Sequence, residues 1–122
     1  MEVLERSNLC ELLEEAFGSV EDVTPDPSQP IHLLLPRLEL PEPWQPSPTR
    51  ALTIWEDWPG TRPRFLIDEA VVGENDQPPR SNSTVYVAGE SWRQFSFAFP
   101  WAGSDPVRVV QLWLERFTVE RV

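Results

Sequence analysis

The sequence predicts a single α+β domain, with an N-terminal helix, an antiparallel β-meander of three to five strands and a C-terminal helix packed on one face of the sheet. Three observations support this prediction. Apolar residues recur at helical spacing near the start of the chain, they alternate with polar residues in the middle, and Asp105-Pro106 opens a second helical pattern near the end. The length of 122 residues suits one domain, and no internal repeat is visible, so residues 1–122 are treated as one unit.

Residues 2–17 are predicted to form the first helix. Its apolar positions lie three and four residues apart on one face: Leu9, Leu12, Leu13, Ala16, Phe17 and Val20. Asn8 and Glu11 have the spacing of a capping box, and Gly18 suits the left-handed residue that ends a helix. The opposite face carries three acidic side chains, Glu11, Glu14 and Glu15. Such a face is either simply solvated or part of a partner-binding surface.

Residues 25–48 contain eight prolines, which makes a helix there nearly impossible. The apolar residues between positions 31 and 40 predict one or two extended segments, with Pro36 forcing a bulge or an edge position. Residues 41–48 resemble a polyproline-type connector. This connector is either a ligand for an aromatic groove or, as we prefer, a surface loop pinned by Trp44.

The next elements are predicted to be strands. They cover residues 51–55, residues 65–72 and a hairpin over residues 84–99. A turn-rich break separates the first two, and residues 73–83 have no apolar side chain except proline, which predicts an exposed loop. In the second arm of the hairpin, alternation places three aromatic residues on one face, toward the core: Phe95, Phe97 and Phe99.

A second helix is predicted over residues 106–118. Asp105 suits its N-cap and Pro106 its first position. Its apolar stripe consists of Val107, Val110, Leu114 and Phe117, with Trp113 beside it. The β-branched content of this segment leaves a strand as the alternative.

Composition excludes several classes of function. The chain has 20 acidic residues and 10 basic ones, all Arg, for a net charge of −10. This charge disfavours binding to nucleic acid or to an anionic membrane, because both need clustered positive charge. A single Cys and a single His do not suffice for a disulfide framework or a multi-thiolate zinc site, so no metal or cofactor is predicted. No run of apolar residues is long enough to span a membrane and no signal-peptide pattern begins the chain, so a cytoplasmic location is expected.

The two most reactive side chains are predicted to be structural. Cys10 lies in the first helix beside its apolar face, and the neighbouring glutamates raise the pKa of a thiol. His32 flanks an apolar strand without a Ser or Cys partner nearby in the sequence. An enzyme remains as a third hypothesis. It would need a cleft that joins Asp57 or Asp68 with Arg62 or Arg80.

The six Trp residues are more than one small core needs. Exposed Trp side chains often mark the centre of a protein interface. Trp58 and Trp101 each lie beside a proline in a predicted turn, and they are the best candidates for such a role.

The order of helix, strands and helix resembles the ubiquitin-conjugating-enzyme (UBC-like) and RWD-like fold. The segment Trp58-Pro59-Gly60-Thr61-Arg62-Pro63 resembles the Tyr-Pro-x-x-Pro-Pro turn of that family, with Trp58 in place of Tyr and one proline missing. The Trp-containing segment over residues 91–95, followed by a last helix, is similar to bacterial members found with ubiquitin-like modification genes. In the family, the active Cys follows the strands near a His-Pro-Asn turn. Residues 73–105 contain neither Cys nor His, so the resemblance implies a catalytically inactive relative.

The expected function is therefore non-enzymatic protein binding, in a bacterial modification or anti-phage defence system as the resemblance implies. The predicted partner-binding residues are Trp58, Trp101, Arg62, Glu11, Glu14 and Glu15. The expected partner is another protein, either a ubiquitin-like protein or an activating enzyme. The alternative is a small acidic inhibitor or immunity-type protein that neutralises a basic partner such as a nuclease toxin, with charge steering the association.

Overall fold

The computed structural model describes residues 6–24, 26, 28–56, 63–73, 76, 82–87, 89–95 and 105–119. Within these residues the chain forms two helices and six strands. They are α1 (Arg6–Phe17), β1 (Glu21–Asp22), β2 (Ile31–Leu38), β3 (Thr49–Trp55), β4 (Arg64–Asp68), β5 (Asn82–Val87), β6 (Glu90–Phe95) and α2 (Pro106–Val119). The predicted class, α+β with a helix at each end of an antiparallel sheet, is confirmed.

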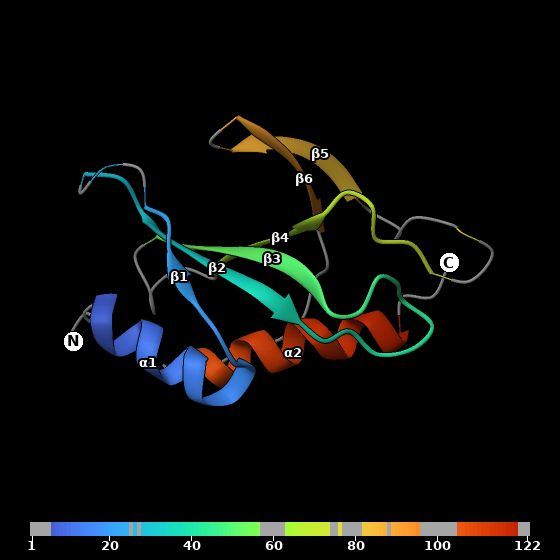
Figure 1. The fold of residues 1–122 in the computed structure, drawn as a ribbon, viewed down its shortest axis with the longest axis horizontal. Coiled ribbons are helices and arrows are strands. Elements are labelled where there is room, and N and C mark those ends of the chain that lie inside the picture. The colour runs from blue at the N-terminus through green and yellow to red at the C-terminus, as the bar shows by residue number, and fades with distance from the viewer. Residues whose placement is uncertain are drawn as a thin grey trace.

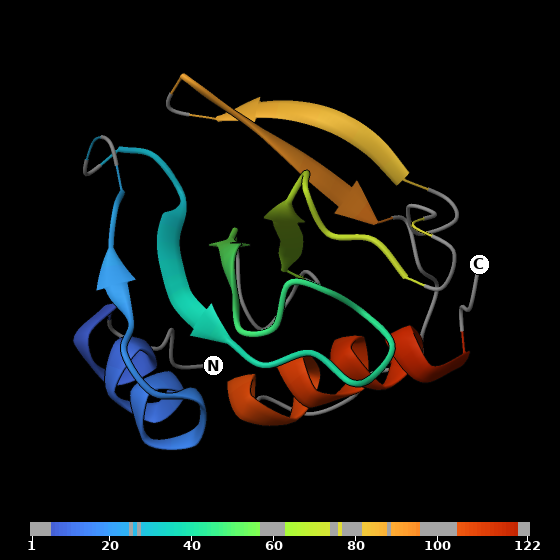
Figure 2. The same cartoon turned by 45° about the vertical axis from the view of Figure 1, so that its right-hand side comes forward.

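The sheet has six strands in the order β1-β2-β3-β4-β6-β5, and every neighbouring pair is antiparallel. The predicted number of three to five was too low, because β1 is only two acidic residues long and carries no alternating pattern. The first four strands follow one another as a meander. The last two do not, because β6 pairs with β4 and leaves β5 at the edge. Figures 1 and 2 show both helices on one side of the sheet, with the β5–β6 hairpin rising away from them.

Helix α1 ends as the sequence predicts. Gly18 has a φ of 89°, and its N–H donates to the carbonyl oxygen of Glu14 at 3.0 Å. The predicted capping box is wrong, because Asn8 lies inside the helix and not before it. The predicted apolar face is only partly buried. Leu9 and Leu13 are in the core, whereas Leu12 is 39 % exposed.

The proline-rich segment contains both a strand and an anchored loop. Strand β2 changes register between Leu35 and Leu38, which places the predicted bulge at Pro36. Trp44 is 2 % exposed, and the next residue, Gln45, exchanges two backbone hydrogen bonds with Val72, at 2.9 and 2.8 Å. The loop is therefore pinned by Trp44, as predicted. The predicted strand over residues 65–72 ends early, because Val72 pairs with this loop and not with the sheet.

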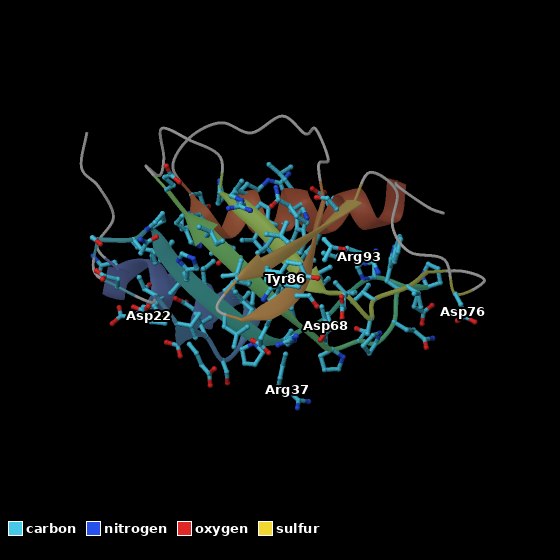
Figure 3. The ribbon with its side chains drawn as sticks, turned by 90° about the horizontal axis from the view of Figure 1, so that it is seen from above. Asp22, Arg37, Asp68, Asp76, Tyr86 and Arg93 are labelled. Carbon is cyan, nitrogen blue, oxygen red and sulfur yellow. The ribbon has the colours of Figure 1, made fainter. Side chains whose placement is uncertain are left out.

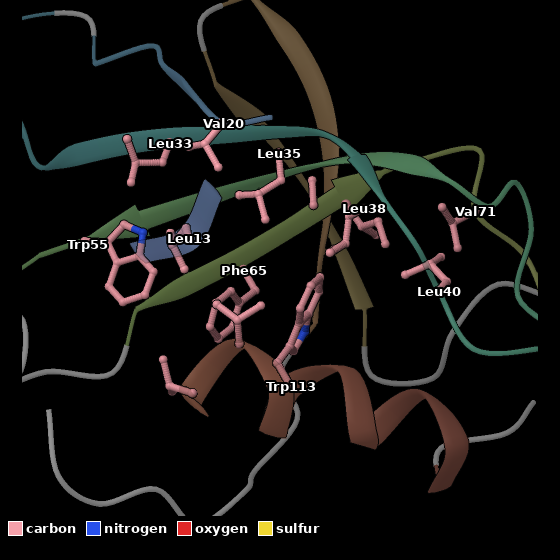
Figure 4. Packing of buried hydrophobic residues seen from close by; sticks show 14 of the residues in the cluster. Leu13, Val20, Leu33, Leu35, Leu38, Leu40, Trp55, Phe65, Val71 and Trp113 are labelled. Carbon is pink, nitrogen blue, oxygen red and sulfur yellow. The ribbon is translucent and has the colours of Figure 1, made fainter. Parts of the chain in front are cut away.

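The main core lies between the helices and the sheet. Trp113 of α2 stacks on Phe65 of β4 with ring centroids 4.8 Å apart and planes at 18° (Figure 4). The indole N–H of Trp55 donates to the Thr53 hydroxyl at 2.7 Å, and that hydroxyl donates to the Leu33 carbonyl at 3.0 Å. These bonds satisfy the polar atoms of two buried side chains, so the core keeps few unpaired groups there.

The C-terminal segment is a helix, as predicted, and not a strand. The Asp105 carboxylate accepts hydrogen bonds from the N–H groups of Val107 at 3.0 Å and Arg108 at 3.4 Å, which is the predicted N-cap. Val110 of the predicted stripe is buried, as are Trp113 beside it and Val109, whereas Val107 and Leu114 are half-buried. The side chains of Phe95, Phe97, Phe99 and Phe117 lie outside the described part of the chain, as does most of the predicted loop over residues 73–83.

Candidate functional site

The sheet has a second apolar face, on the side that neither of the two described helices covers. Alternation turns the even-numbered residues of β3, of β4 and of β2 before its bulge toward this side, where Leu34 lies opposite Leu52 and Leu52 opposite Leu66. Trp92 of β6 lies on the same face, opposite Val85 of β5. The buried members of this cluster are Leu52, Ile54, Leu66 and Trp92, with Leu34, Val85 and Val87 packed against them. Both faces of the sheet therefore carry apolar side chains, although helices cover only one.

This second face contains an open groove of about 230 Å³. Its lining residues are Val23, His32, Leu34, Leu52, Val87, Glu90 and Trp92. Because Val23 follows β1 whereas Val87 and Glu90 lie at the tip of the β5–β6 hairpin, the two ends of the sheet border the same groove. In Figure 1 the hairpin rises from the sheet on the side away from the helices, and its residues Val87 and Glu90 line the groove.

The floor of the groove consists of aliphatic and aromatic side chains with little exposed area. Leu52 and Trp92 are each 2 % exposed, and His32 is 7 % exposed. The indole nitrogen of Trp92 is buried and has no hydrogen-bond partner among the residues that the structure describes. Packing, together with the Arg50 guanidinium that lies over the ring, therefore holds this side chain in place.

A charged cluster made of Arg50, Asp68 and Glu90 lies beside Trp92. The Arg50 guanidinium carbon is 4.2 Å from the centre of the Trp92 ring, a cation–π distance. The guanidinium binds Asp68 through Nε at 2.7 Å and Glu90 through Nη1 at 2.7 Å. Figure 3, which looks at the sheet from above, labels Asp68 at the end of β4 and Tyr86 on the hairpin. The cluster fixes the end of β4 to the tip of the hairpin, and so it supports one wall of the groove.

The contacts in the cluster shift the pKa values of Asp68 and Arg50. Partial burial alone would raise the pKa of Asp68, but the Ala70 N–H and the Arg50 guanidinium stabilise the carboxylate more strongly, so the pKa lies below its ordinary value. Burial likewise opposes the charge on Arg50, and the two carboxylates outweigh it and raise the pKa of the guanidinium. Asp68 and Arg50 are therefore both charged at neutral pH.

Of the six predicted partner-binding residues, the three that the structure describes lie away from the groove. Glu11, Glu14 and Glu15 are exposed on α1, on the helix side of the sheet, and the structure does not bring them near the groove. Trp58, Trp101 and Arg62 lie outside the described residues. The four Trp residues that the structure does describe are all buried: Trp44, Trp55, Trp92 and Trp113.

Sequence reasoning did not identify the groove. A signal was present, because β2 and β3 are apolar at both parities: Leu33, Leu34 and Leu35 are consecutive, and Leu52 and Ile54 alternate with buried neighbours. An antiparallel strand with one solvated face normally alternates apolar and polar residues. A strand that is apolar on both faces indicates that something covers the second face.

Cys10 and His32 do not form a catalytic pair. Cys10 lies on α1 and packs against the core on the helix side, whereas His32 borders the groove on the opposite face. The thiol points to the Val20 carbonyl oxygen at 3.9 Å, and His32 Nδ1 lies 2.7 Å from the Pro30 carbonyl oxygen. Burial first, and then the nearby carboxylates of Glu14, Asp22 and Glu11, raise the pKa of the Cys10 thiol, so it stays protonated at neutral pH.

Of the groups in the third hypothesis, an acid–base cleft, the structure describes only Asp68. Asp68 binds Arg50 and the Ala70 N–H, so its carboxylate already serves the cluster beside Trp92. Asp57, Arg62 and Arg80 lie outside the described residues. Within the described ranges, no three His, Cys, Asp or Glu side chains gather as metal ligands would.

The helices that the structure describes are too short and too polar to cross a lipid bilayer. Compared with known proteins, the chain matches no family model, no curated protein and no solved structure.

Proposed function

We propose that this chain is a non-enzymatic protein-binding module that receives an apolar side chain of its partner in the groove on the helix-free face. The observation that carries the proposal is an open groove of about 230 Å³ with aliphatic and aromatic walls, on a face that no described helix covers. Apolar surface of this kind is costly to expose to water, and a complementary side chain that fills it gains the hydrophobic free energy.

The accessibility of the lining residues supports this use. Leu34 and Val87 are half-buried, and Val23 is 39 % exposed at the rim. A buried floor with a partly exposed rim is typical of the centre of a protein interface, where a few anchoring contacts contribute most of the affinity.

The charge of the chain favours a basic partner. The net charge is −10, and Glu90 at the rim keeps 56 % of its side chain exposed although it binds Arg50. A field of this sign attracts cationic proteins and accelerates their association. The partner is therefore expected to place an apolar side chain between Arg or Lys residues.

The resemblance to inactive UBC-like or RWD-like domains belongs to the same proposal. The helix, antiparallel strands and helix occur in the order that the resemblance requires, and Cys10 and His32 lie on opposite faces of the sheet. A role in a bacterial modification or anti-phage defence system follows from that resemblance.

A second candidate is the acidic inhibitor, which would use α1 in place of the groove. Glu11, Glu14 and Glu15 are all exposed on one helix, and this observation favours it. Such a helix would bind a basic surface through many exposed charges, and added salt would strongly weaken this binding because it screens them.

Two matched substitutions test the proposed site. Val23 at the groove and Leu12 on α1 are both 39 % exposed, so Val23→Asp and Leu12→Asp place the same charge at equally exposed positions on opposite sides of the molecule. We expect the partner purified from the native host, identified by mass spectrometry, to lose roughly tenfold or more in affinity for Val23→Asp and little for Leu12→Asp. Isothermal titration calorimetry measures both.

The other outcomes have definite meanings. Loss of binding with Leu12→Asp alone would favour the α1 surface and the inhibitor. Unchanged binding with both variants would contradict the groove as the site. Circular dichroism of the two variants checks that each retains the fold of the parent chain.

A further inference from the structure

We propose that the outer edge of β5 accepts an extended, basic segment of the partner as a seventh strand of the sheet. This inference rests on the proposed function and names the mode of binding. The edge consists of Asn82–Val87, because β6 is the only strand among the described residues that pairs with β5. Strand addition of this kind uses main-chain hydrogen bonds for affinity and alternate side chains for specificity.

The two edges of the sheet differ in protection. At one edge, β1 is two residues long and both are acidic, which makes it a poor template for another strand. At the other edge, β5 is six residues long and contains no charged residue and no proline. Its sequence is Asn-Ser-Thr-Val-Tyr-Val, rich in residues that favour strands. Edges of this kind normally carry charge, proline or a cover, and β5 carries none of these within its own sequence.

The hairpin register shows which backbone groups face the open edge. Val87 lies opposite Glu90 with two residues between them, so these two residues close the hairpin as a hydrogen-bonded pair. Hydrogen-bonded and non-hydrogen-bonded pairs alternate along an antiparallel ladder. Val85 therefore directs its backbone groups toward β6, whereas Thr84 and Tyr86 direct their N–H and C=O groups toward the open edge.

The side chains of β5 provide contacts on both faces of an added strand. Val85 and Val87 are half-buried against the apolar cluster, and Val87 lines the groove. Tyr86 has the opposite orientation and is 76 % exposed. A strand beside β5 would place alternate side chains next to the groove and the others next to the Tyr86 ring. One segment of the partner can thus pair with the edge and fill the groove.

An open strand edge could pair with a second copy of this chain or with a segment of another protein, and the charge of the chain distinguishes between the two. A second copy of this chain would bring another net charge of −10 to the interface, and the two copies would repel one another. A basic segment suits both properties of this edge. Its β-branched residues would pair with the uncharged strand β5, and adjacent Arg or Lys residues would be attracted by the negative charge of the chain. The occupant is therefore a basic segment of another protein.

The test uses yeast-displayed random peptides about ten residues long as the probe, selected on the full chain. We expect the enriched peptides to carry a net positive charge and β-branched or aromatic residues at alternate positions. Tyr86→Pro removes an amide that faces away from β6, so the hairpin keeps its internal bonds, and we expect a roughly tenfold loss of peptide affinity. Tyr86→Thr keeps the amide and is the matched control, with a smaller loss.

A second measurement needs no variant. In the wild-type chain, amide hydrogen exchange followed by NMR is expected to slow roughly tenfold at Thr84 and Tyr86 when a selected peptide binds, and to stay unchanged at Glu21 and Asp22. Any one of four results would overturn the inference. The selection could enrich no peptide or only acidic peptides, Tyr86→Pro could bind the selected peptides as tightly as the parent does, or amide exchange at Thr84 and Tyr86 could stay unchanged. Self-association of the wild-type chain that Tyr86→Pro abolishes would overturn it in favour of a second copy.

The failure of this inference differs from the failure of the proposed function. If the native partner is sensitive to Val23→Asp but binds Tyr86→Pro normally, the groove is the site and strand addition is wrong. If neither substitution changes the binding of that partner, both proposals are wrong.

Discussion

The two faces of this sheet are built from the same strands and yet differ in what covers them. On the helix side, α1 and α2 bury a large cluster that contains three of the described Trp side chains: Trp44, Trp55 and Trp113. On the other side, the buried part of the cluster has only four residues, and an open groove lies beside them. The covered face holds the fold together, whereas the open face keeps apolar surface that folding alone does not require. Apolar residues in excess of what the helices cover are therefore the strongest indication of function in this chain.

The largest effect should come from the two tryptophans that represent the two faces. Trp113→Ala is expected to lower the free energy of unfolding by about 3–5 kcal/mol, because the ring stacks on Phe65 in the closed core. Trp92→Ala should cost roughly 1–2 kcal/mol less, because solvent from the groove can fill the space it leaves. Urea denaturation measures both. Equal costs would mean that the helix-free face is as closed as the core.

Neighbouring leucines on β2 sharpen the comparison within one strand. Leu35 is 1 % exposed and faces the helices, and Leu35→Ala is expected to cost about 2–5 kcal/mol. Leu34 is half-buried on the opposite face, and Leu34→Ala should cost about 1 kcal/mol. The same urea denaturation applies, and a larger loss for Leu34→Ala would reverse the assignment of the two faces.

The charged cluster beside Trp92 predicts a smaller effect that depends on pH. The Asp68 carboxylate has a lower pKa in the folded chain than in the unfolded one, so its ionisation stabilises the fold at pH values above the ordinary Asp pKa of about 3.9. Asp68→Asn is expected to cost about 1 kcal/mol at pH 7. This difference between variant and parent should vanish as the pH falls through the folded pKa, where Asp68 is protonated.

Glu90→Gln is the control for that experiment, because Glu90 binds the same guanidinium but is 56 % exposed. It should cost less than about 0.5 kcal/mol. Thermal melts at a series of pH values compare the two variants with the parent. A constant cost of Asp68→Asn from neutral pH to about pH 2 would show that its ionisation does not contribute to stability.

The smallest effect on stability is expected at the groove rim. Val23→Asp and Leu12→Asp should each change the free energy of unfolding by less than about 0.5 kcal/mol, because both positions are substantially exposed. Chemical denaturation checks this. A large loss for Val23→Asp would show that the rim belongs to the core and would weaken the comparison between the faces.

The sequence predicts local features of this fold better than long-range ones. The cap at Asp105, the left-handed Gly18 and the bulge at Pro36 all depend on the conformational preferences of a few adjacent residues, and all three are confirmed. The anchoring of the proline-rich loop by Trp44 is confirmed as well. Each of these features has a short-range physical cause that one sequence can reveal.

The features that the sequence did not predict depend on pairing across long distances. The order of β6 and β5 reverses the meander, and Val72 pairs with Gln45 and not with the sheet. The groove requires Val23, Leu52 and Val87, which come from three separate parts of the chain. Alternation gives the face of a strand but neither the neighbour of that strand nor the curvature of the sheet, so the site could not be located from the sequence.

The contact between Gly73 and Trp44 has a practical consequence. A Cβ atom on residue 73 would lie 3.1 Å from the Trp44 ring, so the turn after β4 fits closely over the proline-rich loop. Trp44 and Leu40 also belong to the main core. By composition, residues 41–48 would be chosen as a place to cut, extend or tag the molecule. Any such engineering would open the hydrophobic interior, and protease digestion should accordingly begin somewhere else along the chain.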